Sequence, residues 1–173
     1  VSTHARENIA FALFPTPERA YQYGVLHFDA VHERAYDIAR AEYFFTEAHR
    51  LDPYHPYVMH QLARVAFLRG DMKTALWRVD KEIEMNSDPS PSSYYVRGLI
   101  LGYMGRYEEA AGSYETYLTH DPSNWAAVND YAWVLLKAER PQDAALATAA
   151  ALENWPDNPW LLNTHAIALY EMN

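Results

Sequence analysis

The sequence has 173 residues, which suffices for one domain with a sizeable hydrophobic core. Half of the residues are apolar and 14% are aromatic, which excludes an intrinsically disordered chain. The formal net charge of −9 argues against nucleic acid as a partner, because phosphate binding needs a basic surface, and the absence of cysteine excludes disulfides and thiol nucleophiles.

The first segment, residues 2–14, has the composition of a short helix that prolines then separate from the rest. We expect Ile9, Leu13 and Phe14 to pack on one side of it. An array of helical repeats needs a cap at each open end. We therefore interpret residues 1–16 as an N-terminal capping helix, in preference to a functional arm.

Proline closes four successive segments of the chain, at Pro53, Pro89, Pro122 and Pro156. The intervals of 36, 33 and 34 residues are nearly constant, and a period in the thirties is typical of a repeat array. Each repeat is predicted to be a hairpin of two amphipathic helices. Such a hairpin cannot bury its apolar face alone, so neighbours must stack.

These prolines set the limits of the predicted repeats. One repeat domain, residues 17–173, would hold repeats at 17–54, 55–90, 91–123 and 124–157, followed by a single helix at 158–173. The first repeat has about five extra residues around positions 31–35, relative to the typical period. This excess indicates either longer helices or an insertion in the turn between them.

Residues 94–122 show the pattern most clearly, as YYVRGLILGYMGRYEEAAGSYETYLTHDP. A glycine stands within the first helix at Gly98, a turn glycine follows at Gly105, and Tyr114 is the large residue of the second helix. This pattern resembles the tetratricopeptide repeat family, and the resemblance extends over residues 17–173. It implies an all-α fold, an α-solenoid of antiparallel helix hairpins that winds into a right-handed superhelix.

Small and large residues alternate between the paired helices in this pattern. The small residues that would let two helices approach closely are Gly24, Ala63, Gly98, Ala132 and Ala166, and the large ones that would fill the space are Phe45, Val79 and Tyr114. Gly70 and Gly105 stand where the first helix of a hairpin must end. Glu82 departs from the pattern, because a small residue is expected there.

Residues 159–173 form one predicted helix without a partner. Leu162 and Leu169 repeat the first-helix pattern, and we expect them to face the preceding repeat. The other flank, with Trp160 and Ile167, has few charges. The segment is either the closing helix or the first half of a truncated fifth repeat. We favour truncation, with a homo-oligomer through this C-terminal helix as its consequence.

The chain offers no recognisable catalytic motif. The closest histidine pairs, His27 with His32 and His55 with His60, are five residues apart, a spacing that puts the two rings of each pair on different helix faces. There is no Gly-rich phosphate loop and no Gly-x-Ser-x-Gly nucleophile elbow. We therefore predict that the protein is not an enzyme and has no catalytic residue, no cofactor and no metal site.

The family resemblance implies a concave groove lined mainly by the first helix of each repeat. Mapped onto this chain, the protein-binding groove consists of Tyr57, His60, Gln61, Arg64, Tyr95, Leu99, Asn129, Asp130, Trp133, Asn163 and Tyr170, with Tyr103, Lys137, Trp160 and Ile167 beside them. Tyrosine and tryptophan supply contact area, and asparagine can hold a peptide backbone amide. For Tyr95 and Trp133, packing between neighbouring hairpins is an equally good interpretation.

We predict a protein–protein interaction scaffold or adaptor that binds a protein or peptide segment in this groove. Some relatives clamp a terminal carboxylate with basic residues, but Tyr95 and Asp130 stand at matching positions here, and Asp130 would repel a carboxylate. The alternatives are a self-assembling structural module and a regulatory or recruiting arm of a larger enzyme.

The sequence does not fix the cellular compartment. No apolar run approaches the length of a membrane span, and no signal peptide is visible. These features favour a soluble, cytoplasmic protein. Residues upstream of Val1 could carry a targeting or anchor segment.

Overall fold

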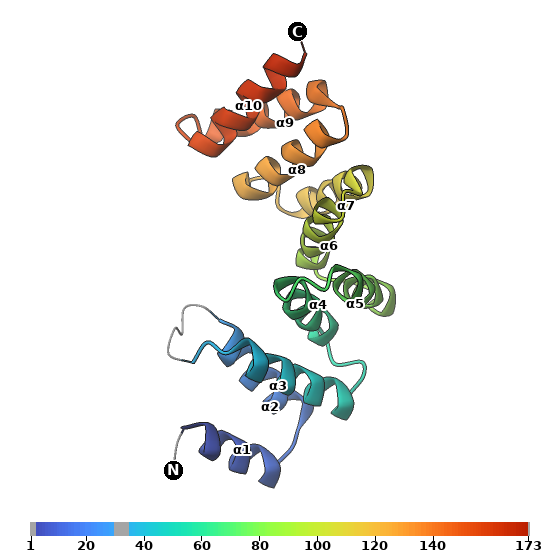
Figure 1. Cartoon of the computed structure of the whole chain (residues 1–173), viewed down its shortest axis with the longest axis vertical. Coiled ribbons are helices and arrows are strands. Elements are labelled where there is room, and N and C mark those ends of the chain that lie inside the picture. Colours follow the sequence, from blue (N-terminus) through green and yellow to red (C-terminus); the bar gives the residue numbers. More distant parts are fainter. Residues whose placement is uncertain (1–2, 30–34, 173) are drawn as a thin grey trace. The chain divides into compact units, whose positions relative to one another are not determined.

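The computed structural model describes residues 3–29 and 35–172, and these form ten α-helices and no strand. The helices are α1 (Thr3–Leu13), α2 (Pro17–Phe28), α3 (Ile38–Leu51), α4 (Val58–Leu68), α5 (Met72–Met85), α6 (Pro91–Tyr103), α7 (Tyr107–His120), α8 (Trp125–Lys137), α9 (Pro141–Asn154) and α10 (Pro159–Glu171). Four hairpins pair α2 with α3, α4 with α5, α6 with α7, and α8 with α9 (Figure 1). The predicted all-α fold of helix hairpins is confirmed.

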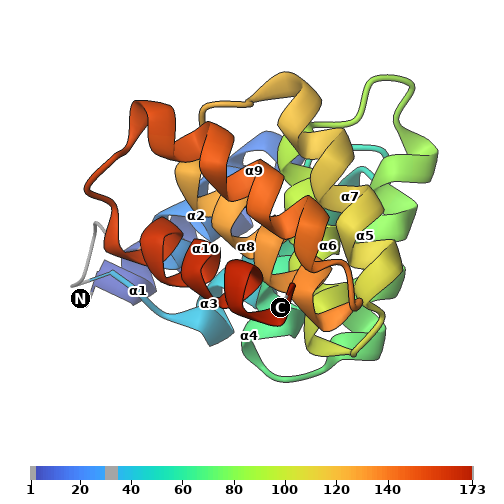
Figure 2. The same ribbon diagram turned by 90° about the horizontal axis from the view of Figure 1, so that it is seen from above.

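The chain divides into two compact parts, an N-terminal half that ends at Asp88 and a C-terminal half that begins at Pro89. The division falls in the connection between α5 and α6. Each half has its own core: Phe44 and Phe45 are fully buried in the first, and Leu101 and Leu135 in the second. In the C-terminal half, α10 lies against α9 and α8 (Figure 2). The predicted repeat limits remain predictions.

In two of the hairpins, a glycine of the first helix lets an aromatic ring of the second helix pack directly against its backbone. A Cβ atom added to Gly24 in α2 would lie 2.5 Å from ring carbons of Phe45 in α3. At Gly98 in α6, the same atom would lie 3.0 Å from the ring of Tyr114 in α7. Real Cβ atoms essentially never lie as close as 2.5 Å, so only glycine permits the approach at Gly24, and a contact of 3.0 Å at Gly98 is tighter than most real Cβ contacts. The predicted pairs of small and large residues are confirmed in both hairpins.

The turns inside three hairpins require left-handed backbone. Gly70 has φ of 80° and Gly105 has φ of 75°, as the sequence predicts for residues that end a helix. Glu139 takes the same role before Arg140 and Pro141, with φ of 60°. Pro141 is the first residue of α9, where its missing N–H leaves no hydrogen bond unmade.

The extra length of the first hairpin lies in its connection rather than in its helices. The helix α2 ends at Phe28 and α3 begins at Ile38, and both have ordinary lengths of 12 and 14 residues. Asp37 caps α3 by accepting a hydrogen bond of 3.0 Å from the backbone N–H of Arg40. Of the predicted insertion, positions 31–34 lie outside the described residues.

The predicted face of the N-terminal helix is wrong. Phe11 is buried and meets the ring of Phe44 edge-on at 5.7 Å, whereas Ile9, Leu13 and Phe14 are all more than half exposed. The polar partners of α1 explain its rotation. Glu7, one turn before Phe11, places its Oε2 atom 2.8 Å from Arg40 Nη2 and 2.9 Å from His27 Nε2. The helix therefore turns its Glu7–Phe11 face toward α2 and α3.

The predicted face of the last helix is also wrong. Leu161, Thr164 and Ala168 are the buried residues of α10, whereas Leu162, Ala166 and Leu169 are exposed. Ala166 therefore does not serve as a close-approach residue. Two polar contacts favour the observed rotation. The Thr164 hydroxyl donates to Asn129 Oδ1 at 2.8 Å, and Thr148 Oγ1 lies 2.8 Å from Nδ1 of His165.

Glu82, which departs from the repeat pattern, caps the N-terminus of α4 from the neighbouring helix α5. Tyr57, the residue before α4, is left-handed with φ of 65° and provides no side-chain cap. The buried Glu82 carboxylate instead accepts hydrogen bonds from the backbone N–H groups of Tyr57 and His60. Asn86 Nδ2 also donates to Glu82 Oε1 at 2.7 Å. These bonds satisfy backbone donors that every helix start leaves unpaired.

The glycine contacts give a direct test of the packing. Replacing Gly24 with Ala should lower the free energy of unfolding by about 1–3 kcal/mol, because the fully buried Phe45 ring cannot move aside. Gly112 in α7 is the matched control, since an added Cβ there meets nothing within 4 Å. Gly112→Ala should raise stability by about 0.5–1 kcal/mol through helix propensity. Urea denaturation measures both, and a neutral Gly24→Ala would contradict the close approach.

Candidate functional site

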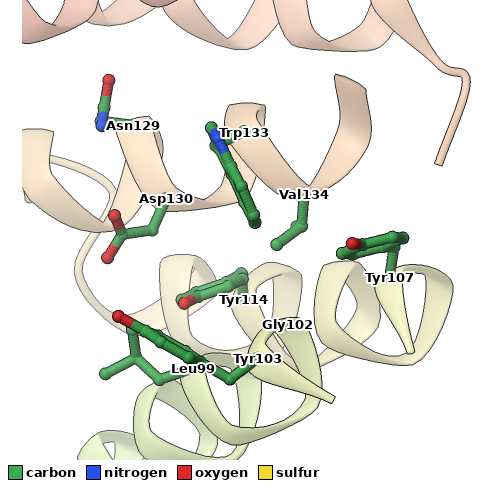
Figure 3. Close-up of a pocket in the computed structure, with 9 residues that line it drawn as sticks. All are labelled: Leu99, Gly102, Tyr103, Tyr107, Tyr114, Asn129, Asp130, Trp133 and Val134. Atoms are coloured by element: carbon green, nitrogen blue, oxygen red, sulfur yellow. The ribbon is translucent and has the colours of Figure 1, made fainter. Parts of the chain in front are cut away.

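The C-terminal half contains a hollow of about 460 Å³ between α6, α7 and α8 (Figure 3). Its wall is mainly aromatic and aliphatic, with one carboxylate and one amide. The residues that line it are Leu99, Gly102, Tyr103, Tyr107, Tyr114, Asn129, Asp130, Trp133 and Val134. We take this aromatic hollow as the candidate binding site, because such sites combine apolar walls with a few convergent polar groups.

The spacing of residues on α6 and α8 explains why they meet in one place. Leu99 and Tyr103 are four residues apart on α6, and Asp130 and Val134 are four apart on α8, so each pair shares one helix face. In Figure 3, Asp130 and Trp133 point from α8 toward α6 and α7. Gly102 of α6 keeps the space open, since an added Cβ would lie 3.3 Å from Val134.

Asp130 is the charged group of the hollow. Its Oδ2 atom accepts a hydrogen bond of 2.8 Å from the hydroxyl of Tyr95. Burial raises the pKa of Asp130 above the ordinary value of an aspartate, and the hydrogen bond from Tyr95 acts in the opposite direction. Within the described part of the chain, Asp130 forms no ion pair, and its Oδ1 atom has no hydrogen-bond partner. The site thus holds a partly buried carboxylate with one open oxygen.

Trp133 forms the most accessible part of the aromatic wall on α8, with 45% of its surface exposed. The Tyr107 ring meets it edge-on, with centroids 6.2 Å apart. The ammonium group of Lys137 lies 5.5 Å from the Trp133 ring centre, although Lys137 does not line the hollow. Tyr114 is fully buried and forms the floor, where it meets Tyr95 edge-on at 5.7 Å. These contacts leave large aromatic surface open beside Asp130.

Asn129 stands at the rim rather than in the base of the hollow. It points away from Asp130 and Trp133 (Figure 3), and its Oδ1 atom accepts the hydrogen bond from Thr164 of α10. Its Nδ2 atom has no partner among the described residues. Asn129 can therefore offer an amide donor to a ligand, while its oxygen serves the packing of α10.

Four of the predicted groove residues, Tyr57, His60, Gln61 and Arg64, lie at or in α4 in the N-terminal half. His60 is buried, and burial together with the charge of Arg64 lowers its pKa to about 4. Arg64 is exposed, and its guanidinium lies 4.7 Å from the centre of the Phe28 ring. Arg64 Nη1 also donates to Gln61 Oε1 at 2.9 Å. His60 thus belongs to the core, whereas the other three remain at the surface.

The remaining predicted residues divide between the hollow and α10. Leu99, Asn129, Asp130 and Trp133 line the hollow, and Tyr95 reaches it only through its hydroxyl on Asp130. Asn163 and Tyr170 are exposed on α10 and do not line it. The prediction that these residues bind a partner stays a prediction.

Four lining residues were not predicted as part of the groove: Gly102, Tyr107, Tyr114 and Val134. The sequence pattern predicts a packing role for Tyr114. The available signal was the position of Gly102, four residues after Gly98 on the same face of α6. A second small residue on that face leaves room that the next hairpin does not fill.

The described residues contain no group of three or more histidine, aspartate or glutamate side chains placed to hold a metal ion. No helix among residues 3–29 and 35–172 is long and apolar enough to cross a membrane.

The hairpin architecture and the hollow between first helices define a protein built from helical hairpin repeats. The family model described as tetratricopeptide repeat matches residues 95–159. No curated protein matches the sequence. Residues 95–159 therefore match the tetratricopeptide repeat, and the structural likenesses given below show the same fold over most of the chain.

Three solved structures illustrate the likeness. YrrB, described as a tetratricopeptide repeat protein with an unusual peptide-binding site, is 16% identical with a TM-score of 0.80, over 96% of this chain and 84% of its own. The matched chain of the APC/C hetero-tetramer Cut9–Hcn1 is 18% identical with a TM-score of 0.77. The match covers 89% of this chain but 30% of that chain. The first tetratricopeptide repeat domain of Spaghetti (RPAP3), bound to the HSP90 peptide SRMEEVD, is 20% identical with a TM-score of 0.63. The match covers 71% of this chain and 93% of that chain.

The environment of Asp130 predicts a pH-dependent effect on stability. Because its pKa is raised in the folded chain, folding holds that proton more tightly, so stability falls as pH rises from its ordinary pKa of 3.8 through the folded value. The Asp130→Asn variant keeps an oxygen acceptor for the Tyr95 hydroxyl but has no carboxyl group to ionise, so it does not lose stability in this way as pH rises. In urea denaturation the variant should be more stable than the parent chain at about pH 7, and equal to it near pH 3.

Glu153→Gln is the matched control for this measurement, because Glu153 is exposed on α9. It should leave stability unchanged at both pH values. If the Asp130→Asn variant is instead less stable than the parent chain at neutral pH, the ionised carboxylate stabilises the fold, and this prediction is wrong.

Proposed function

We propose that this chain is a protein-interaction module that binds an extended peptide segment of a partner protein in the aromatic hollow. The observation that carries the proposal is the exposure of Trp133 and Tyr103, at 45% and 73%, beside the part-buried Asp130. Large exposed aromatic side chains at the edge of a hollow are typical of binding hot spots. Packing within the hairpins does not account for this much open surface.

The composition of the hollow favours binding over catalysis. Its lining includes no histidine, serine, threonine or lysine, and Asp130 is its one carboxylate. A general acid–base pair or an activated nucleophile needs two such groups within hydrogen-bond reach. The hollow instead provides contact area, an amide donor at Asn129 and a single charge, which are the elements of peptide recognition.

Two of the similar structures support this class of function. YrrB is described as having a peptide-binding site, and the Spaghetti repeat domain is bound to a peptide with two glutamates and a final aspartate. In this chain the carboxylate of Asp130 lines the hollow and no basic residue does. An acidic peptide is therefore a poor ligand for this hollow, and the partner differs in charge.

The test uses peptides selected from a random display library on the full chain. Replacing Trp133 with Ala should weaken the binding of the selected peptides by about 2 kcal/mol, because truncating an aromatic hot spot removes most of its contact area. Trp77→Ala is the matched control, since Trp77 is exposed on α5 and outside the hollow. Fluorescence anisotropy measures both. Peptides that bind the Trp133 variant as tightly as the parent chain would refute this site.

A second candidate function is self-association through α10, in line with a homo-oligomer. Five large apolar side chains are exposed on this one helix: Trp160, Leu162, Ile167, Leu169 and Tyr170. Apolar residues gathered in this number on a surface helix are typical of an interface. A further repeat stacked on α10 would cover the same face.

Sedimentation velocity separates this candidate from a single-chain adaptor. If α10 joins two copies, Ile167→Lys should shift the chain toward monomer over a concentration series, because a buried lysine without a partner is costly. Leu146→Lys is the control, as Leu146 is exposed on α9 at 71%. A parent chain that stays monomeric at all concentrations, or an Ile167→Lys variant that dimerises like the parent, would exclude self-association through this face.

A further inference from the structure

We propose that the aromatic hollow selects an arginine side chain of the bound peptide, with the guanidinium on Asp130 Oδ1 and its plane against the aromatic wall. This inference rests on the proposed function, because it names the chemistry that the same hollow recognises. Three observations carry it: the unpaired carboxylate, the charge of the C-terminal half, and the open aromatic faces beside Asp130.

The carboxylate of Asp130 lacks a positive partner within the described part of the chain. Tyr95 satisfies Oδ2 at 2.8 Å, and Oδ1 has no hydrogen-bond partner. A charge removed from water without a counter-charge is costly, and a peptide that covered it with an apolar group would increase that cost. A guanidinium supplies N–H donors and an opposite charge at once. The open oxygen thus favours a cationic ligand group.

The charge around the hollow points the same way. Residues 89–173 contain four arginine or lysine residues against ten aspartate or glutamate residues, a formal charge of −6. The described arginines of this half are engaged elsewhere. Arg106 pairs with Glu109, Arg140 pairs with Asp143 and Glu108, and Arg97 donates to Ser113. The field of this half therefore attracts a basic ligand to the hollow.

The aromatic wall suits a guanidinium better than an ammonium. Lys137, one turn after Trp133 on α8, places its cation 5.5 Å from the Trp133 ring centre, within the distance at which an indole ring attracts positive charge. An ammonium is strongly hydrated and keeps its water, whereas the guanidinium is planar, weakly hydrated and stacks on aromatic faces. The ligand position is partly buried, so the cation with the smaller desolvation penalty is favoured there.

The experiment starts from the display-selected peptides and measures fluorescence anisotropy with synthetic variants of the tightest one. Replacing its arginine with glutamine should weaken binding about 10- to 100-fold, the value of a charged hydrogen bond. Replacement with lysine should weaken it several-fold. On the Asp130→Asn chain, the arginine and glutamine peptides should bind equally. On the Glu153→Gln chain, which loses the same charge elsewhere, the gap should remain.

Each outcome decides the matter. Peptides that need Trp133 but show no preference for arginine, or that bind the Asp130→Asn chain unchanged, overturn the arginine inference and leave the proposed function intact. Lysine bound as tightly as arginine overturns the choice of guanidinium. Peptides that ignore Trp133 overturn the proposed function itself. If circular dichroism shows that the Asp130→Asn chain is unfolded, the test is made on the parent chain. There the difference in affinity between the arginine and glutamine peptides must shrink at high salt, since screening weakens a charge pair.

Discussion

The close approach of paired helices on glycine is the constraint on which this structure depends. At Gly24 the ring of Phe45 occupies the space of a missing side chain, and at Gly98 the ring of Tyr114 does the same. Each pair fixes the distance and rotation of its hairpin, because a buried ring fits in only one position. Tyr114 also forms the floor of the hollow. The packing of one hairpin therefore positions the surface that α6 presents.

The hollow exists because the next hairpin does not fill it. Gly102 adds no side chain toward Val134, and Trp133 remains nearly half exposed. Asp130 is held beside it by Tyr95, although its burial works against the charged form. Groups kept in unfavourable surroundings are candidates for function, because stability alone would not retain them. Binding of a cation would satisfy this carboxylate.

The sequence was sufficient for the hairpins but not for every helix face. Proline and glycine act through their own backbone, so the helix starts and turns at Gly70, Gly105 and Pro141 could be predicted from residue type alone. The rotations of α1 and α10 depend on polar contacts, among them those of Glu7 and Thr164, with residues far away in the chain. An apolar count assigned those helices the wrong face because it ignores such contacts.

The candidate site was predictable in part for the same reason. Leu99, Asp130 and Trp133 follow from their place on the first helices, whereas the burial of His60 and the orientation of Asn129 depend on neighbours that no local pattern specifies. Tyr107 and Tyr114 show that one ring can be both a packing residue and part of a wall. A pattern that assigns each residue a single role misses such residues.

The most direct test of the account is the nuclear magnetic resonance spectrum of the chain with nitrogen-15 in its five tryptophan indoles. A display-selected peptide is added in steps, and the indole N–H signals are followed. The account predicts that the signal of Trp133 shifts most, while those of Trp77 and Trp160 stay in place. A peptide that shifts Trp77 or Trp160 and leaves Trp133 unchanged would contradict it.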